Sequence, residues 1–277
     1  MVHPNCRSFL PRVRPWGKMF SRVLLQLVFV LFSLALTSAS YAAGVPVACK
    51  EYARFGVPGK DGTLLCRTGY LLAHDTDRKT PIWVAEHLTY EKVDASLART
   101  NNFQPDPDLE EGERAELSDY KKSGYDRGHM APAADMRWSQ QAMTESFFLS
   151  NMVPQVGRGM NQGIWKNLEE KVRVWTINRG EVYIYTGPIY TGTPKVIGKN
   201  EVAVPSHLYK IVYDPIQVEA IAFIMPNQKL NTADMPTYIV PIRDIEEKTG
   251  LNFLSKLRKR VQDSVETEKA VGLWNDE

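Results

Sequence analysis

The four residues Asp126-Arg127-Gly128-His129 place an acid, a permanent cation and a titratable imidazole in one short segment. In an extended segment the side chains of Arg127 and His129 project to the same side, because side chains alternate along a strand. One face then presents a guanidinium suited to a phosphate and a base suited to a water. Gly128 permits an unusual backbone angle or the close approach of a ligand. The pattern favours attack of water on a phosphate.

A second group of polar residues stands beside a segment with helical periodicity. Apolar residues recur at intervals of four, four and three, at Ile164, Leu168, Val172 and Trp175. Asn161 precedes them and would either cap the helix or offer a neutral oxygen to a hard cation. Glu169 lies eight residues later, about 12 Å along the axis and about 80° round it if both residues are helical. The two would then not share a metal as direct ligands, but Glu169 could hold waters bound to a cation at Asn161.

The elements that must position these residues are short strands and two helical regions. Segments rich in β-branched and aromatic residues, each bounded by Gly, Pro or Asn, predict strands over residues 82–88, 181–185, 208–213 and 218–225. One helix is predicted to end at Gly180, and a second helical region runs over about 243–265 with a break near Gly250. Helices scattered among strands that can pair as hairpins predict an α+β fold with a mixed, mostly antiparallel sheet.

Composition sets limits on organisation and partners. Residues 43–277 contain no internal repeat, low-complexity segment or Gly/Ser linker, so we expect a single domain there. The Pro-rich and acidic residues 104–116 predict a solvated surface loop. The chain has 34 Lys+Arg and 32 Asp+Glu, but five of the basic side chains and none of the acidic ones lie in residues 1–42, which leaves 29 against 32. A nucleic-acid partner would therefore have to be recognised by local basic clusters.

The first 42 residues predict a secretory signal peptide. Residues 23–36 form an apolar run of 14 residues, preceded by basic residues and followed by small ones, with cleavage expected after Ala42. Met19 is an alternative start, and an uncleaved N-terminal anchor is the alternative reading. A membrane-spanning helix needs roughly 20 apolar residues, and no later segment reaches that length. We expect an exported protein, periplasmic or extracellular, without stable membrane association once the leader is removed.

The cysteines agree with export. Cys6 lies in the leader, which leaves Cys49 and Cys66 with 16 residues between them. In an oxidising compartment the pair could close a loop worth about 3 kcal/mol on the chain-entropy model; the alternative is two unrelated thiols. No Cys/His spacing typical of a zinc site is present.

Common catalytic signatures are missing, but three longer motifs carry a resemblance. The chain has no GxSxG, HExxH, GxxxxGK[ST] or GxGxxG motif. It does contain, in order, DRGHMAPAAD, SNMVPQ and MNQGIWKNLEE. These motifs resemble the DNA/RNA non-specific endonucleases, whose hallmark is a DRGH active-site motif, and are most similar to the endonuclease G branch. Further similarity in RWSQQAM, VIGKNEVAVPSH and YIVPI extends the resemblance over most of residues 70–258.

The resemblance implies a ββα-metal site, in which two strands and a helix surround one divalent cation, usually Mg²⁺, with Mn²⁺ as a substitute. It implies that His129 is the general base that deprotonates the attacking water. Asn161 would be the sole direct protein ligand of the metal, and Glu169 would orient the waters that complete its shell. Mg²⁺ dehydrates reluctantly, so a water-rich shell on one Asn is physically sensible.

The resemblance also implies supporting roles. Asn151 would help to position the cluster, Arg127 would contact the phosphate, and Asp126 with Gly128 would brace the motif. Arg99 is the candidate for a second phosphate-binding arginine. DNA and RNA would be bound through the phosphate backbone, so base identity would be little read. Candidate basic contacts are Lys121, Lys122, Arg137, Arg158 and Lys166.

Two other functions and a second location remain open at this level. A secreted nucleic-acid binder could keep the fold without turnover, and a related phosphodiesterase could act on small or lipid phosphoesters. Endonuclease G proteins are typically mitochondrial, which makes the intermembrane space the alternative location. The glycine-rich residues 157–160 before Asn161 depart from the usual family pattern, which bears on cation placement and substrate entry. A homodimer and a protein inhibitor are both compatible with the sequence.

Overall fold

The structure is a computed structural model that describes residues 44–275. The predicted leader, its cleavage site and the alternative start at Met19 lie outside the described residues. Within residues 44–275, no helix is both long enough and apolar enough to cross a membrane.

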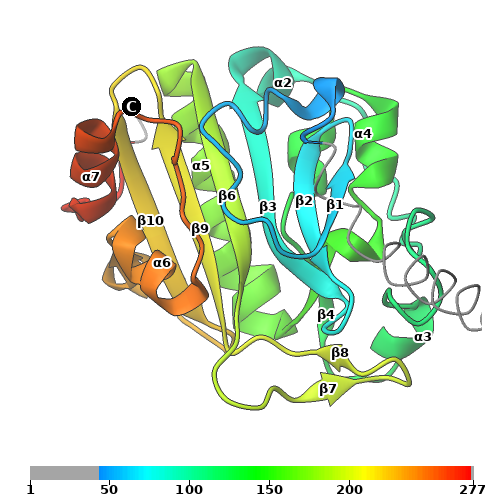
Figure 1. Cartoon of the computed structure of the whole chain (residues 1–277). Coiled ribbons are helices and arrows are strands. Elements are labelled where there is room, and N and C mark those ends of the chain that lie inside the picture. Colours follow the sequence, from blue (N-terminus) through cyan, green and yellow to red (C-terminus); the bar gives the residue numbers. More distant parts are fainter. Residues whose placement is uncertain (1–43, 276–277) are drawn as a thin grey trace, which may run out of the picture. The chain divides into compact units, whose positions relative to one another are not determined.

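A seven-stranded sheet forms the centre of the described fold (Figure 1). Its strands, in spatial order, are β1 (Thr63–Cys66), β2 (Tyr70–Asp75), β3 (Thr80–Thr89), β6 (Glu181–Ile189), β9 (His207–Asp214), β10 (Glu219–Pro226) and β11 (Ile239–Val240). Every neighbouring pair in this sheet is antiparallel. Among the described residues, a parallel contact occurs at the isolated bridge between Gln104 and Phe148. The prediction of an α+β fold with a mostly antiparallel sheet is confirmed.

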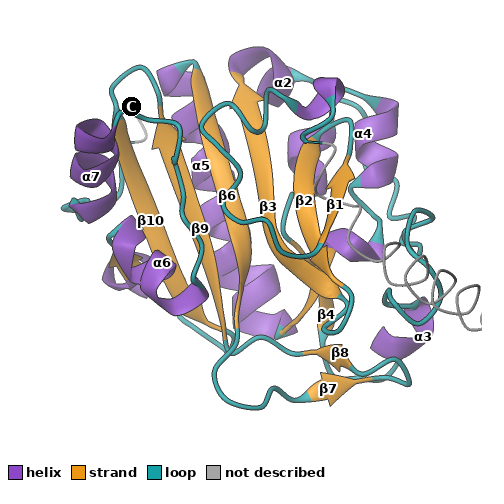
Figure 2. Cartoon of the chain, viewed as in Figure 1, coloured by secondary structure: helices purple, strands orange, loops and turns teal. Residues whose placement is uncertain are grey.

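Helices cover both faces of this sheet (Figure 2). Helix α5 (Lys166–Arg179) lies behind it in that view, and α6 (Ile242–Thr249) and α7 (Lys259–Thr267) lie in front. Three shorter helices are α2 (Tyr90–Asp94), α3 (Leu117–Tyr120) and α4 (Gln140–Glu145). Single turns occur at η1 (Val47–Cys49), η2 (Ala133–Met136), η3 (Leu149–Asn151) and η5 (Thr232–Tyr238).

The predicted helices form where the periodicity placed them. The stripe Leu168, Val172 and Trp175 is buried on α5, and Gly180 ends that helix with a φ of +86°. The second helical region is two helices, because Gly250 ends α6 in the left-handed conformation and a loop follows before α7. Helices α5 and α6 therefore stop at the glycines that the sequence marked.

A two-stranded antiparallel pair brings the acid-Arg-Gly-His motif next to α5. Strand β4 (Asp126–His129) is antiparallel to β5 (Met152–Gln155), with His129 opposite Met152. The kinked segment η4 (Gly157–Trp165) then leads from β5 into α5. A second small pair, β7 (Val196–Ile197) and β8 (Val202–Ala203), lies at the lower end of the molecule in Figure 1.

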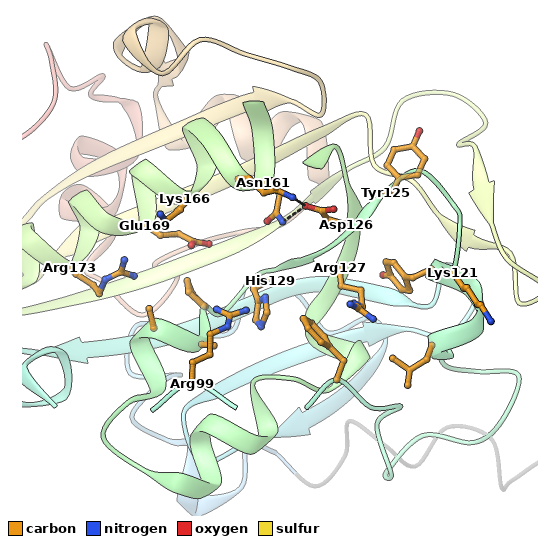
Figure 3. A pocket seen from close by; sticks show the side chains of 17 residues that line it. Arg99, Lys121, Tyr125, Asp126, Arg127, His129, Asn161, Lys166, Glu169 and Arg173 are labelled. Atoms are coloured by element: carbon orange, nitrogen blue, oxygen red, sulfur yellow. Dashed lines mark hydrogen bonds between the residues drawn. The ribbon is translucent and has the colours of Figure 1, made fainter. Parts of the chain in front are cut away.

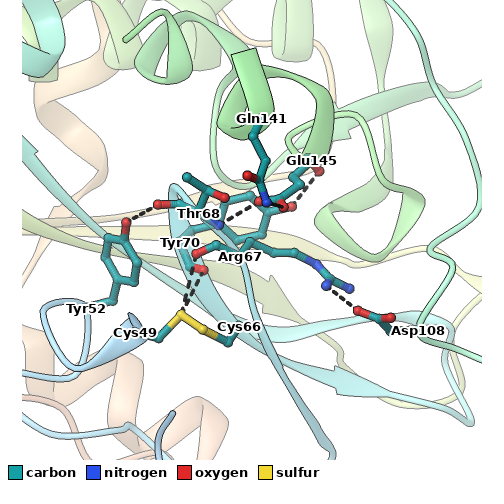
Figure 4. Close-up of a disulfide and its surroundings, with 9 residues drawn as sticks. All are labelled: Cys49, Tyr52, Cys66, Arg67, Thr68, Tyr70, Asp108, Gln141 and Glu145. Atoms are coloured by element: carbon teal, nitrogen blue, oxygen red, sulfur yellow. Dashed lines mark hydrogen bonds and ion pairs between the residues drawn. A yellow bond between two sulfur atoms is a disulfide. The ribbon is translucent and has the colours of Figure 1, made fainter. Parts of the chain in front are cut away.

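The amino-terminal segment is fastened to the edge of the sheet by a disulfide between Cys49 and Cys66 (Figure 4). The next residue, Arg67, donates from Nη2 to both carboxylate oxygens of Asp106, at 2.5 and 2.6 Å. Asp106 is fully buried and also accepts a hydrogen bond from Ser150. The prediction that residues 104–116 form a solvated loop is therefore wrong at this point, because a buried ion pair holds the loop against the sheet and the segment before β5.

Candidate active site

A cavity of about 870 Å³ opens between β4, the start of α5 and the segments before α3 and η2 (Figure 3). Most of the predicted site residues contribute to its wall. These are Arg99, Asp126, Arg127, His129, Asn161, Lys166 and Glu169. The wall also contains Arg173, Phe103 and Tyr125, which the sequence reasoning did not select.

Strand β4 presents Arg127 and His129 to the cavity, as the alternation of side chains predicted. Gly128, between them, does not have the unusual backbone angle that was one of the two expectations, because its φ is not positive. A Cβ on Gly128 would instead lie 2.0 Å from Oε1 of Gln155, on the paired strand β5. The glycine therefore makes room for a protein side chain across the strand pair.

His129 is a neutral base held in an aromatic setting. Only 9% of the residue is exposed, and its ring lies 5.6 Å from that of Phe103 and 5.2 Å from that of Phe147. Burial, followed by the positive charges of Arg99 and Arg127, lowers the pKa of His129 to about 3. Its Nε2 has no hydrogen-bond partner among the described residues. The imidazole is thus uncharged at neutral pH, and Nε2 is available to accept a proton.

Two arginines are held over the same aromatic pair. The guanidinium of Arg127 lies 4.0 Å from the ring centre of Phe103, and that of Arg99 lies 5.1 Å from the ring centre of Phe147. The two phenylalanine rings meet edge to face at 4.9 Å. Such stacking fixes a flexible cation while leaving its N–H groups free for a phosphate.

Asn161 is oriented by the acid of the motif. Its Nδ2 donates to Oδ2 of Asp126 at 2.9 Å, and Nε2 of Gln162 donates to the same oxygen at 2.7 Å. Because the amide nitrogen is engaged, the amide oxygen is the group left to bind a cation. Asn161 does not cap α5, whose first flanking residue is Trp165. The capping alternative is therefore wrong. Asn161 and Glu169 are also not separated by regular helix, because Gly163 breaks the helical geometry between them.

Glu169 and Arg173 lie one turn apart on α5 and both line the cavity. Burial, partly offset by the positive charge of Lys210, raises the pKa of Glu169 to about 7. Arg173 is held by Asp135, with 2.8 Å between Nη1 and Oδ1. The spacing of four residues from Glu169 is the sequence signal by which Arg173 could have been found.

These donors fit one hard divalent cation with a mostly aqueous shell. A neutral amide oxygen at Asn161 and a carboxylate at Glu169 are oxygen ligands of the kind that Mg²⁺ prefers, directly or through waters. The part of the chain that the structure describes contains no group of three or more His, Cys, Asp or Glu side chains able to hold a metal. A cation here would therefore keep most of its waters.

Asn151 lies behind the cavity and is not part of its wall. It is fully buried; its Oδ1 accepts from the backbone N–H of Ala131, and its Nδ2 donates to the carbonyls of Ala131 and Ser146, all at 2.9 Å. These bonds fix the chain two residues after His129. The expected positioning role fits this geometry, whereas a direct catalytic role does not.

The predicted basic contacts divide into two groups. Lys121 and Lys166 line the cavity, and Lys166 also pairs with Glu170 at 3.4 Å. Lys122, Arg137 and Arg158 are not part of the wall. Arg137 donates instead to the backbone carbonyls of Leu97 and Ser96, at 2.9 and 3.2 Å. Its position is therefore that of a structural residue.

Comparisons with known proteins point to one family. The family model described as DNA/RNA non-specific endonuclease matches residues 50–260. Mitochondrial endonuclease G of Homo sapiens is 37% identical over 225 residues, covering 76% of this chain and 75% of the relative. Nuclease C1 of Cunninghamella echinulata var. echinulata is 37% identical over 220 residues, covering 74% and 87%.

A solved structure gives the same fold. It is described as "Crystal structure of the EndoG/EndoGI complex: Mechanism of EndoG inhibition". The superposition has a TM-score of 0.73 at 34% identity, and it covers 78% of this chain and 95% of the solved one.

Proposed function

Because the chain belongs to the DNA/RNA non-specific endonuclease family, we propose that it hydrolyses phosphodiester bonds of both DNA and RNA with one divalent cation. Membership of this family supports nuclease activity. The mechanism is supported above all by one arrangement: a neutral His129 and two arginines share a cavity with an asparagine whose amide is oriented by Asp126.

In this mechanism His129 accepts a proton from the water that attacks phosphorus. Arg127 and Arg99 neutralise the charge that develops on the phosphoryl oxygens, because both guanidiniums are already held over aromatic rings beside the base. Asn161 would hold the cation by its amide oxygen, and Glu169 would orient the waters of its shell. When bound, the cation supplies charge stabilisation at the phosphate and the leaving oxygen.

Mg²⁺ is the proposed cation, and Mn²⁺ is expected to substitute for it. The donor set provides oxygen ligands and few of them, which suits an ion that retains its waters. Substrate binding rests on contacts with phosphate from Arg127, Arg99, Lys166 and Lys121. Affinity should therefore fall steeply with salt and depend little on base sequence.

We further propose that residues 43–277 act as a single exported domain, periplasmic or extracellular, without a membrane anchor. The leader pattern in residues 1–42 and the disulfide between Cys49 and Cys66 support export to an oxidising compartment. Relatives named as mitochondrial make the intermembrane space the alternative. The solved EndoG/EndoGI complex supports a protein inhibitor as a partner.

The test uses purified residues 43–277 with supercoiled plasmid and with RNA, each with Mg²⁺ or with EDTA. We expect degradation of both substrates that is lost with EDTA and greatly weakened in Asn161→Ala. The exposed residue Asn252, on the opposite face of the sheet, provides the matched control Asn252→Ala, which should retain activity. Cleavage that survives EDTA would overturn the one-metal mechanism. Folded wild-type protein that binds DNA without cutting it under Mg²⁺, Mn²⁺ or Ca²⁺ would indicate a binding module instead.

A further inference from the structure

A second, smaller cavity of about 250 Å³ adjoins the active site. We call it the flanking pocket. Its wall comes from the residue before β4, from the connection between β6 and β7, and from the segments that follow β8 and β10. The members used below are Tyr125, Thr191, Thr193, Lys195, Pro205 and Asn227. Tyr125 lines both this pocket and the active-site cavity, so the two are neighbours across one aromatic side chain.

One residue of the flanking pocket, Asn227, is hydrogen-bonded to the segment that leads from β5 into η4. Asn227 donates from Nδ2 to the carbonyls of Pro154 and Pro205, both at 3.0 Å, and accepts from the backbone N–H of Val156 at 2.9 Å. Because these bonds saturate its amide, Asn227 serves to join the pocket to β5 and the start of η4. The pocket is therefore fixed relative to the strand pair that carries His129.

The rest of the wall presents polar side chains that have no hydrogen-bond partner among the described residues. Thr191, Thr193 and Lys195 are exposed, and they present two hydroxyls and an ammonium. The half-buried ring of Tyr125 adds apolar surface, next to the buried Pro205. A flat apolar face, hydroxyls that can donate or accept, and one cation together suit a nucleotide: the base stacks, and the phosphate meets the lysine.

The position of Tyr125 relates the flanking pocket to the reacting phosphate. Tyr125 directly precedes β4 and stands two residues from Arg127, a separation of about 6.6 Å along an extended chain. Figure 3 shows Tyr125 beyond Asp126, on the side of the cavity away from Glu169 and Arg173. A strand whose phosphate lies at His129 and Arg127 would pass Tyr125 as it leaves the cavity on this side.

We infer that the flanking pocket binds one nucleotide of the strand being cut, adjacent to the scissile phosphate, with its base against Tyr125 and a phosphate at Lys195. The inference rests on the proposed nuclease function and gives it a subsite. A base has a flat face whatever its identity, so the pocket adds affinity without sequence preference. It is too small for a stretch of duplex, so the nucleotide that it holds is unpaired.

The test measures kcat/KM for labelled single-stranded oligonucleotides with one cleavable phosphodiester, lengthened by one nucleotide at a time on the 5′ or the 3′ side. For the wild-type protein, the step that fills the pocket should raise kcat/KM about tenfold, and only on one side. In Lys195→Ala, and in Thr193→Trp, which fills the pocket, the ratio between the longer and the shorter substrate should fall at least fivefold. Tyr125→Leu should reduce the same ratio.

Lys199 provides the matched control, because it is an exposed lysine four residues from Lys195, in the turn between β7 and β8, and is not part of the pocket wall. Lys199→Ala should keep the wild-type ratio, and thermal unfolding should show that every variant is folded. A wild-type protein that cleaves these substrates with a ratio unaffected by Lys195→Ala and Thr193→Trp would overturn the subsite and leave the nuclease function standing. If wild-type protein cleaved none of them, nor plasmid or RNA, both proposals would fail.

Discussion

The two faces of the central sheet are buried in different ways. On the face toward α5, charged side chains of the strands are buried among apolar ones, notably Glu86 on β3 and Lys210 on β9, each 1% exposed. On the face toward α6 and α7, the strands bury mainly aromatic residues, such as Trp83, Tyr185 and Tyr209. Both faces are equally inaccessible to water, so the difference lies in what is buried.

The charges on the α5 face are incompletely paired. Nζ of Lys210 donates to Oγ1 of Thr186 at 2.7 Å and lies 5.2 Å from the ring centre of Trp165, just before α5. Neither carboxylate oxygen of Glu86 has a hydrogen-bond partner among the described residues. Burial raises the pKa of Glu86 well above its usual value, and the negative charge of Asp135 raises it further. Such groups lower stability, and they lie on the side that carries Glu169 and Arg173.

The face toward α6 and α7 is stabilised by aromatic packing, although Nε1 of Trp83 and the hydroxyl of Tyr185 also lack a hydrogen-bond partner among the described residues. The ring of Phe253 meets Tyr185 at 5.5 Å and Tyr209 at 5.7 Å, and the disulfide closes the amino-terminal segment over the same side. Edge-to-face aromatic contacts of this kind add to the stabilisation from buried area. One face of the sheet therefore mainly stabilises the fold, while the other maintains the environment of the site. Substitutions on the two faces should therefore separate activity from stability.

The largest effect is expected for His129→Ala on the active side. Removal of the general base should lower kcat by about 10²- to 10⁴-fold. The free energy of unfolding should change by only about 1 kcal/mol, because the substitution also removes a buried nitrogen without a partner. Plasmid cleavage and urea unfolding on one protein sample measure both quantities. Unchanged turnover would show that His129 is not the base.

The opposite pattern is expected for Phe253→Ala. Loss of a fully buried ring should lower the free energy of unfolding by about 3–5 kcal/mol. Because Phe253 lies across the sheet from the cavity, kcat at a temperature where the variant is folded should stay within about twofold of wild type. A large fall in kcat for folded protein would show that the two faces are coupled.

Removal of the disulfide should be milder. Cys49→Ser combined with Cys66→Ser should lower the free energy of unfolding by about 3 kcal/mol, because the unfolded chain loses a cross-link between residues 17 apart. Activity at low temperature should persist. Unfolding with and without a reductant compares the variant with wild type. A reductant that destabilised the double variant as much as wild type would rule out the disulfide as the cause.

The smallest effect is expected on the pH dependence of stability, which two buried carboxyl groups should influence. Burial raises the pKa of Glu266, on α7, to about 7, as it does for Glu169 in the cavity. Between about pH 4.5 and 7 the folded state binds more protons at each site than the unfolded state, so stability falls as pH rises through this window. Glu266→Gln should remove about 1 kcal/mol of that fall and leave activity intact, whereas Glu169→Gln should flatten the dependence and also lower activity.

Urea unfolding at pH 5 and pH 8 in EDTA, with plasmid cleavage in Mg²⁺, distinguishes these two variants. Equal losses of activity in both would contradict the division between the faces. An unchanged pH dependence of stability in Glu266→Gln would show that this carboxyl titrates in its usual range.

The sequence by itself determined the parts of this protein that depend on neighbours along the chain. Side-chain alternation placed Arg127 and His129 on one side of β4, apolar periodicity marked the buried stripe of α5, and glycines marked where α5 and α6 end. The motifs also carried enough similarity to identify the family. These features were predictable because a strand or helix repeats its geometry over a few residues.

Only the tertiary structure decided which distant residues meet. Asp126 orients the Asn161 amide from 35 residues away, and Gln155 explains Gly128 from the paired strand. Phe103 and Phe147 come together to hold both arginines, and the Arg67–Asp106 pair buries a loop whose composition predicted exposure. Periodicity cannot reveal such contacts, because they depend on how segments far apart along the chain pack together. That packing also decides which polar groups lose water, and so which pKa values move.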